Sequence, residues 1–231
     1  MMASDHRQAG RGPARLIIAD DHDLARLGLR RMLADAPGLE LVGEAGDGRA
    51  AVALCQRVQP DLALIDVRMP DLDGLATTRA IKERLPLTRV LIITTHEHPD
   101  YLVAALKAGA AGYLLKDITR DALLDTIRRV LRGESILSGE MVARALQRLA
   151  GERRPPAAPP PERLTPREGE VLALVVEGLT NREIAARLGI SVGTAKIHVE
   201  HIIGKLGVSD RTQAAVCAIR YGLVQPTAVG L

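Results

Sequence analysis

Short apolar runs alternate with segments of helical periodicity over the first 135 residues. The runs have the length of buried strands and occupy residues 15–19, 39–44, 62–65, 90–94 and 112–115. The segments between them repeat apolar residues every three or four positions and occupy residues 24–33, 49–58, 77–84, 101–107 and 121–131. Five such repeats predict an α/β fold, a five-stranded parallel doubly wound sheet with helices on both faces.

A proline-rich segment ends this pattern. Residues 151–163 read GERRPPAAPPPER, with five prolines and almost nothing to bury. Sequences of this kind form semi-rigid extended spacers, so we place a domain boundary here. A further helix is predicted over residues 140–149, leading into the spacer.

Beyond the spacer the pattern predicts only helices. Thr165 and Thr180 are each followed three residues later by Glu, which is the capping-box spacing. Further N-caps are predicted at Ser191 and Asp210, and Gly189 is predicted to end a helix. Four short helices with a tight glycine turn indicate a small all-α domain containing a helix-turn-helix.

Composition narrows the class of protein. The chain has 47% hydrophobic and 26% charged residues and lacks Phe and Trp, so Leu, Val, Ile and Ala must form the core. The net charge of +3 does not by itself indicate a nucleic-acid partner. No apolar run is long enough to cross a membrane, and residues 1–12 lack the apolar core of a signal peptide. Cys55 and Cys217 lack metal-ligand spacing and are expected to be plain thiols in a reducing cytoplasm.

Three carboxylates follow predicted strands. Asp20 and Asp21 come after the first strand and Asp66 after the third. Ligands of open α/β sheets bind beyond the carboxyl ends of the strands, so these groups converge if the two strands are neighbours. Converging carboxylates repel one another, and Mg²⁺ is the cation that best suits such oxygen ligands. The alternative is that these acids merely end strands and cap helices.

Two more residues complete a candidate phosphoryl site. Lys116, after the fifth strand, can neutralise the pocket and hold a phosphoryl oxygen. Thr94, at the end of the fourth, can donate its hydroxyl to the same group. A carboxylate nucleophile, a metal, a lysine and a hydroxyl are the parts needed to accept a phosphoryl group.

The predicted helix over residues 192–206 has one apolar stripe and one unusual polar face. The stripe comprises Val192, Ala195, Val199, Ile202, Ile203 and Leu206. On the other face, Ile197 suits a thymine methyl, Lys196 and His201 suit phosphates or purine acceptors, and Glu200 suits cytosine N4. The alternative, a merely solvated face, is disfavoured by the preceding helix and tight turn.

The runs IIADDHDLARLGL, LIDVRMPDLDG, VLIITT and AGAAGYLLKD resemble the receiver domain of response regulators, which has a flavodoxin-like fold. The resemblance implies that Asp66 is the phosphoacceptor and that Lys116 contacts the phosphate. It implies Mg²⁺ ligation by Asp20, Asp21, Asp66 and the backbone carbonyl of Arg68. It also implies that Thr94 and Tyr113 form a switch pair. Arg68 and His96 flank the position of the attacking water, so they either tune dephosphorylation or are simply solvated.

The C-terminal stretch LTPREGEVLALVVEGLTNREIAARLGISVGTAKIHVEHIIGKLGVSDRTQAAV resembles the LuxR-type helix-turn-helix of NarL/FixJ regulators. The resemblance implies that the helix ending at Leu206 enters the DNA groove. The resemblance places Lys196 and Ile197 at base-contacting positions and Lys205 near the DNA backbone. The full set of predicted DNA-contacting residues is Thr194, Lys196, Ile197, Glu200, His201 and Lys205. In this family the last helix commonly pairs two DNA-binding domains, and such a dimer reads two half-sites about one helical turn apart.

These features predict a cytoplasmic, phosphorylation-dependent transcriptional regulator and not an enzyme. The expected divisions are a receiver over 13–135, a helix and linker over 136–163, and a DNA-binding domain over 164–231. The expected partners are a sensor histidine kinase, promoter DNA, a second copy of the chain after phosphorylation and, as a further candidate, RNA polymerase. The alternatives are a Mg²⁺-dependent phosphatase, a constitutive DNA-binding regulator with a silent receiver, and a pure interaction module. The phosphatase is disfavoured because Arg68 stands where a second acid is needed.

Overall fold

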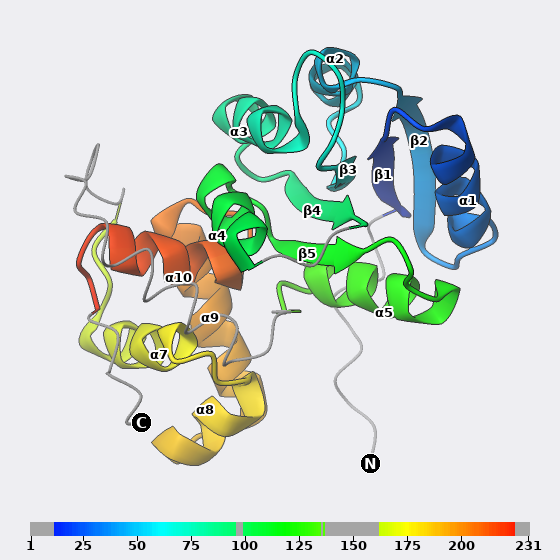
Figure 1. The fold of residues 1–231 in the computed structure, drawn as a ribbon. Coiled ribbons are helices and arrows are strands. Elements are labelled where there is room, and N and C mark those ends of the chain that lie inside the picture. Colours follow the sequence, from blue (N-terminus) through cyan, green and yellow to red (C-terminus); the bar gives the residue numbers. More distant parts are fainter. Residues whose placement is uncertain (1–11, 96–98, 135, 137–161, 225–231) are drawn as a thin grey trace.

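The computed structural model describes residues 12–95, 99–134, 136 and 162–224, which form an α/β domain and a smaller helical domain (Figure 1). The strands are β1 (Ala14–Ala19), β2 (Leu39–Ala45), β3 (Leu62–Asp66), β4 (Arg89–Thr94) and β5 (Gly112–Leu115). They form one parallel sheet in the order β2-β1-β3-β4-β5. The predicted fold class is therefore confirmed.

Helices alternate with these strands and cover both faces of the sheet. They are α1 (Asp23–Leu33), α2 (Gly48–Val58), α3 (Gly74–Arg84), α4 (Pro99–Ala108) and α5 (Arg120–Leu131). Figure 1 shows α1 and α5 on one side of the sheet and α2 and α3 on the other. The helix predicted over residues 140–149 lies outside the described residues.

Alternating side chains of each strand enter two separate cores. Along β1, Leu16 and Ile18 pack with α1 and α5, whereas Ile17 and Ala19 pack with α2 and α3. All four side chains are at most 1% exposed. A strand that is buried on both faces reads as a continuous apolar run, which is why these strands were visible in the sequence.

The second domain consists of α7 (Pro166–Val176), α8 (Asn181–Leu188), α9 (Val192–Leu206) and α10 (Arg211–Arg220). The capping boxes begun by Thr165 and Thr180 are both present. Ser191 accepts from the backbone N–H of Thr194, as an N-cap does. Gly189 ends α8 in the left-handed conformation, with φ of 64°. The predicted helix starts and stops are thus confirmed.

One prediction for α9 is wrong. Val192 was expected in the apolar stripe, but it is 51% exposed. It is the first residue of the helix, and within the described part of the chain about half of its side chain stays uncovered. The remaining stripe residues do pack inward: Ala195, Val199, Ile202 and Leu206 are buried, and Ile203 is half-buried.

The two domains share an apolar core between α4 and α10. Leu102, Val103 and Leu106 of α4 belong to the same buried cluster as the α10 residues Ala214, Ala215, Val216, Cys217 and Ala218. Gln213 also donates through Nε2 to the carbonyl oxygens of Leu106, at 3.3 Å, and Ala110, at 2.7 Å. In this arrangement the receiver covers the helix by which two DNA-binding domains were expected to pair (Figure 1).

Among the helices of the described residues, none is both long and apolar enough to span a membrane.

Candidate functional site

The sheet topology brings the predicted acidic residues together. β1 and β3 are adjacent, with Ala19 opposite Ile65, so Asp20 and Asp66 lie side by side at their carboxyl ends. Both are buried, being 1% and 5% exposed respectively. Two carboxylates buried this close need a positive partner.

Lys116 supplies that partner. Its Nζ lies 2.6 Å from Oδ2 of Asp20 and 2.9 Å from Oδ1 of Asp66. The backbone N–H of Lys116 donates to the carbonyl oxygen of Thr94 at 2.7 Å, which fixes the end of β5 against β4. The lysine is therefore positioned by the strand pairing itself.

The titration of the pocket follows from this geometry. Burial raises the pKa of Asp66 above its usual value, and the hydrogen bond from Lys116 opposes that rise. Burial would lower the pKa of Lys116, but its hydrogen bonds to Asp20 and Asp66 outweigh this and raise it. The raised pKa of Lys116 keeps the lysine charged, whereas burial makes the carboxylate form of Asp66 less favourable than it would be in water.

The loop after β3 fixes the second oxygen of Asp66. The backbone N–H of Arg68 donates to Oδ2 of Asp66 at 3.0 Å, and the Arg68 side chain is exposed. Gly74, which begins α3, packs against this turn so closely that a Cβ there would lie 2.0 Å from the carbonyl oxygen of Asp66. Only glycine fits this approach, so Gly74 helps to place the aspartate.

Asp21 lies at the rim of the pocket with a neighbour that the sequence reasoning missed. Oδ1 of Asp21 is 2.8 Å from Nδ1 of His22, which also lies 3.5 Å from Oδ1 of Asp20. Side-chain ligand atoms of these three residues all lie within 4.8 Å of one another. The sequence feature that could have identified His22 is its position directly after Asp20 and Asp21. It lies in the loop that follows β1, at the carboxyl end of the sheet where the site lies.

Carboxylate oxygens dominate the donor set of the pocket. Asp20, Asp21 and Asp66 offer the hard oxygen atoms that Mg²⁺ prefers, and these three carboxylates outnumber the one ammonium of Lys116 that lies beside Asp20 and Asp66. The residues present therefore fit a magnesium ion.

The predicted switch residues lie between the pocket and the second domain. Thr94 is 3% exposed at the end of β4, next to the Lys116 backbone. Tyr113 of β5 is half-buried and packs against two clusters, the α2–α3–α4 side of the receiver and the core shared with α10. Thr94 therefore lies at the pocket, and Tyr113 lies where the receiver meets α10.

The predicted DNA-contacting residues divide into two groups. Thr194, Lys196, Ile197, Glu200 and His201 are exposed, and Ile197 is notable as an apolar side chain 49% exposed. Lys205 is different: its Nζ lies 2.7 Å from Oε2 of the buried Glu168, which ties α9 to α7. Burial would raise the pKa of Glu168, but hydrogen bonds from Lys205 and Thr165 hold it at about 2.

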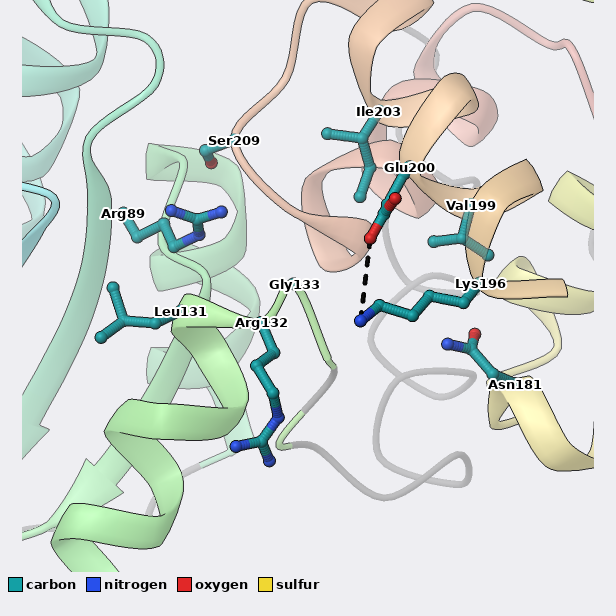
Figure 2. A pocket seen from close by; sticks show the side chains of 10 residues that line it. All are labelled: Arg89, Leu131, Arg132, Gly133, Asn181, Lys196, Val199, Glu200, Ile203 and Ser209. Atoms are coloured by element: carbon teal, nitrogen blue, oxygen red, sulfur yellow. Dashed lines mark ion pairs between the residues drawn. The ribbon is translucent and has the colours of Figure 1, made fainter. Parts of the chain in front are cut away.

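Part of the α9 polar face turns toward the receiver. Lys196 and Glu200 line a cavity together with Ile203 of the apolar stripe and with residues at the end of α5 and the start of β4 (Figure 2). Side chains suited to base contacts therefore lie opposite the receiver in this arrangement.

An α/β domain with a buried aspartate bridged by lysine, joined to a helix-turn-helix, defines a signal-receiving DNA-binding protein. Comparison with known families agrees: residues 16–128 match the response regulator receiver domain, and residues 162–218 match the LuxR family of bacterial regulatory proteins. The chain belongs to the NarL/FixJ family of two-component response regulators.

Individual relatives support this assignment. The transcriptional regulatory protein LiaR of Bacillus subtilis is 40% identical over 91% of this chain and 99% of its own. The nitrate/nitrite response regulator NarL of Escherichia coli is 36% identical over 88% of this chain and 94% of its own. The receiver domain of Mycobacterium tuberculosis NarL superposes with a TM-score of 0.52 at 41% identity, covering 54% of this chain and all of that domain.

Proposed function

We propose that Asp66 accepts a phosphoryl group and that its phosphorylation controls DNA binding by α9. The observation that carries the proposal is the placement of Lys116 between the buried carboxylates of Asp20 and Asp66. The ammonium of Lys116 already lies in the pocket, so a rotation of its side chain is enough to bring it to the oxygens of an incoming phosphoryl group. The domain divisions 13–135, 136–163 and 164–231 are part of this proposal.

The transfer itself is a displacement at phosphorus. An oxygen of Asp66 forms the new P–O bond while the P–N bond to a phosphohistidine of a sensor histidine kinase breaks, and the leaving imidazole takes up a proton. Asp66 enters as a carboxylate, held by Lys116 and the N–H of Arg68. Lys116 and the Thr94 hydroxyl then hold phosphoryl oxygens.

Asp20, Asp21, Asp66 and the backbone carbonyl of Arg68 would hold Mg²⁺. When bound, the ion neutralises charge on the phosphoryl oxygens. Asp20 contributes a buried oxygen and Asp21 one at the rim. His22, beside Asp21, orients that carboxylate through their 2.8 Å contact.

The switch runs through Thr94 and Tyr113 to the α4–α10 interface. Because Tyr113 packs against the core that joins the domains, repacking there weakens the contact between α4 and α10. Separation frees α10 to pair with a second copy of the chain and frees α9 for promoter DNA. Once the regulator is bound at a promoter, RNA polymerase is a further partner in addition to the kinase, the DNA and the second copy of the chain.

On DNA, the exposed residues Thr194, Lys196, Ile197, Glu200 and His201 read or contact the groove. Lys205 forms an ion pair with Glu168. We therefore infer that Lys205 holds α9 against α7 and does not contact the DNA backbone directly. A regulator of this kind acts in the cytoplasm, where the chromosome lies. We also infer that it is not a phosphatase or another enzyme, because the position two residues after Asp66 holds Arg68 instead of a general acid.

Acetyl phosphate with Mg²⁺ tests the proposal on wild type and Asp66→Asn. Wild type should gain the mass of one phosphoryl group, elute as a dimer and bind a two-half-site DNA more tightly, and Asp66→Asn should do none of these. Glu44→Gln serves as a matched carboxylate control outside the pocket and should behave as wild type. Equal DNA binding by wild type and Asp66→Asn after treatment, with wild type phosphorylated, contradicts control by the receiver.

A further inference from the structure

Arg26, in the first turn of α1, reaches back to the loop that carries two of the predicted metal ligands. Its Nη1 donates to the carbonyl oxygen of Asp20 at 2.6 Å. This oxygen belongs to the peptide group that joins Asp20 to Asp21, and because a peptide group is planar, holding its oxygen fixes the orientation of the whole group. The Arg26 side chain is only 19% exposed, so the bond forms where water has little access and is stronger than it would be in solvent.

The start of α1 differs from the starts of the next two helices of the receiver. His22 occupies the N-cap position of α1, and in the described part of the chain its side chain makes no capping hydrogen bond to the helix. Its imidazole contacts the carboxylate of Asp21 instead. The N-cap residues of α2 and α3, Asp47 and Asp73, both accept from backbone N–H groups of their helices. The loop before α1 is therefore restrained from inside the helix, by Arg26, where the other two loops are restrained by their N-cap side chains.

Carboxylates beside Arg26 orient its guanidinium and offset its charge. Nη2 forms an ion pair with Oδ1 of Asp23, in the same turn of the helix. Nε lies 4.0 Å from Oε2 of Glu44, but Arg30 approaches Glu44 more closely, at 3.2 Å, so Glu44 belongs mainly to Arg30. The charge of Asp23 reduces the repulsion between Arg26 and a cation at the neighbouring site. Arg26 can therefore hold the loop without strongly opposing the entry of a metal ion.

The peptide group that Arg26 holds connects two carboxylates in different surroundings. Asp20 is buried, and its Oδ2 lies 2.6 Å from Nζ of Lys116. The backbone N–H of Asp20 also donates to the carbonyl oxygen of Ala45 at 3.1 Å. Asp21 is exposed at the rim of the pocket. A rotation of the peptide group would therefore move Asp21 relative to a fixed Asp20, so the hydrogen bond from Arg26 sets the relative position of these two carboxylates.

We propose that Arg26 is a positioning residue for the metal ligands of the phosphoacceptor pocket: it holds the peptide group between Asp20 and Asp21 so that both carboxylates can bind one divalent cation. The inference rests on the proposed function and adds to it a residue outside the ligand set. Mg²⁺ demands near-octahedral geometry, so a small displacement of one ligand lowers the affinity. Residues that orient metal ligands from outside the ligand set change metal affinity by about 10–100-fold when they are replaced.

Mn²⁺ binding to the unphosphorylated full chain, measured by the electron paramagnetic resonance signal of free Mn²⁺, tests the inference directly. Arg26→Gln should raise the dissociation constant about tenfold. Arg26→Lys keeps a donor for the Asp20 carbonyl and should restore part of the affinity. Arg30→Gln is the matched control, because it removes a guanidinium that pairs with Glu44 from the same helix, and it should leave the affinity unchanged. Urea unfolding checks that each variant is folded under the conditions of the titration.

Phosphorylation by acetyl phosphate supplies the second readout. The Mg²⁺ concentration that gives a half-maximal rate should rise about tenfold in Arg26→Gln, and the rate at saturating Mg²⁺ should stay close to that of wild type. A purely structural role of Arg26 predicts the opposite pattern, a lower maximal rate with an unchanged half-maximal Mg²⁺ concentration. That pattern would contradict the inference.

The Mn²⁺ titration separates failure of this inference from failure of the proposed function. Equal Mn²⁺ affinity of wild type and Arg26→Gln overturns the inference alone. Tighter binding by Arg26→Gln also overturns it, because the charge of Arg26 would then repel the ion more than its hydrogen bond helps. Lack of Mn²⁺ binding by wild type overturns both the metal site and the inference. Weaker binding by Arg26→Gln in a protein whose Asp66 accepts no phosphoryl group supports the inference and overturns only the proposed function.

Discussion

The ammonium of Lys116 lies 2.9 Å from Oδ1 of Asp66, and the same ammonium lies 2.6 Å from Oδ2 of Asp20. One positive charge thus serves two buried carboxylates that come from different strands. The balance is incomplete, because two negative groups share one positive group. A site built this way is stabilised by any further cation that enters it, and the predictions for the pocket depend on that imbalance.

Replacing Lys116 by Gln should destabilise the protein in the absence of divalent metal. We expect a loss of about 1–3 kcal/mol, less than for a fully buried pair because the lysine side chain is 19% exposed. Mg²⁺ should restore part of the loss and stabilise the variant more than wild type, because it takes over the neutralisation of Asp20 and Asp66. Urea unfolding with and without Mg²⁺ measures both effects, with Arg31→Gln as control. Equal stabilisation of both proteins by Mg²⁺ would contradict a shared charge balance.

The same lysine predicts a stability change at alkaline pH. The pKa of Lys116 is raised above the usual 10.5, because hydrogen bonds to Asp20 and Asp66 outweigh the opposing effect of burial. The folded protein therefore retains this proton after the unfolded chain has begun to lose it. The resulting stability is fully present below pH 10.5 and is lost as the pH rises through the raised pKa. The free-energy difference between wild type and Lys116→Gln should shrink over that window; a constant difference argues that the ion pair is not its source.

Gly74 should tolerate no side chain. A Cβ at this position meets the carbonyl oxygen of Asp66 at 2.0 Å, so Gly74→Ala must displace the turn that holds the phosphoacceptor. We expect a loss of about 2–3 kcal/mol and slower phosphorylation by acetyl phosphate. Gly169→Ala is the matched control: a Cβ there has no neighbour within 4 Å, and alanine in a helix should stabilise α7 by about 0.5–1 kcal/mol. Similar unfolding midpoints for the two variants would exclude this steric role.

The sequence predicted the strands, the helix caps and the acidic pocket because each depends on local pattern or on strand order. Asp20 and Asp66 converge as soon as β1 and β3 are known to be neighbours. Val192 was assigned wrongly because periodicity gives a direction around the helix axis but not the extent of the neighbouring helices. The contact of Gln213 with Leu106 and Ala110 was beyond prediction for a similar reason: it depends on how two separately folded domains meet, and no periodicity records that.

Glu168 predicts an acid-sensitive contact inside the DNA-binding domain. Although burial would raise its pKa, hydrogen bonds from Lys205 and the Thr165 backbone keep the pKa at about 2, below the usual 4.5. The stability from this contact is present above pH 4.5 and is lost as the pH falls toward 2. Glu168→Gln keeps a capping residue but loses the charge, so we expect a cost of about 1–3 kcal/mol at neutral pH that declines over this window. Unfolding of both proteins between neutral and acidic pH measures the decline, and a pH-independent cost would point to packing instead of charge.

Gln213 tests whether the contact between α4 and α10 restrains DNA binding. Its amide donates to Leu106 and Ala110 across the interface, and both hydrogen bonds exist only while the domains are in contact. Gln213→Ala should weaken that contact by about 1–2 kcal/mol and raise the DNA affinity of the unphosphorylated protein up to about tenfold. Phosphorylated wild type and phosphorylated variant should bind DNA alike, because the interface is then already open. Fluorescence anisotropy with a two-half-site duplex measures all four affinities. An affinity gain of the same size in both phosphorylation states would show that the substitution acts on DNA contacts directly, and unchanged affinity in both states would show that the interface does not limit binding.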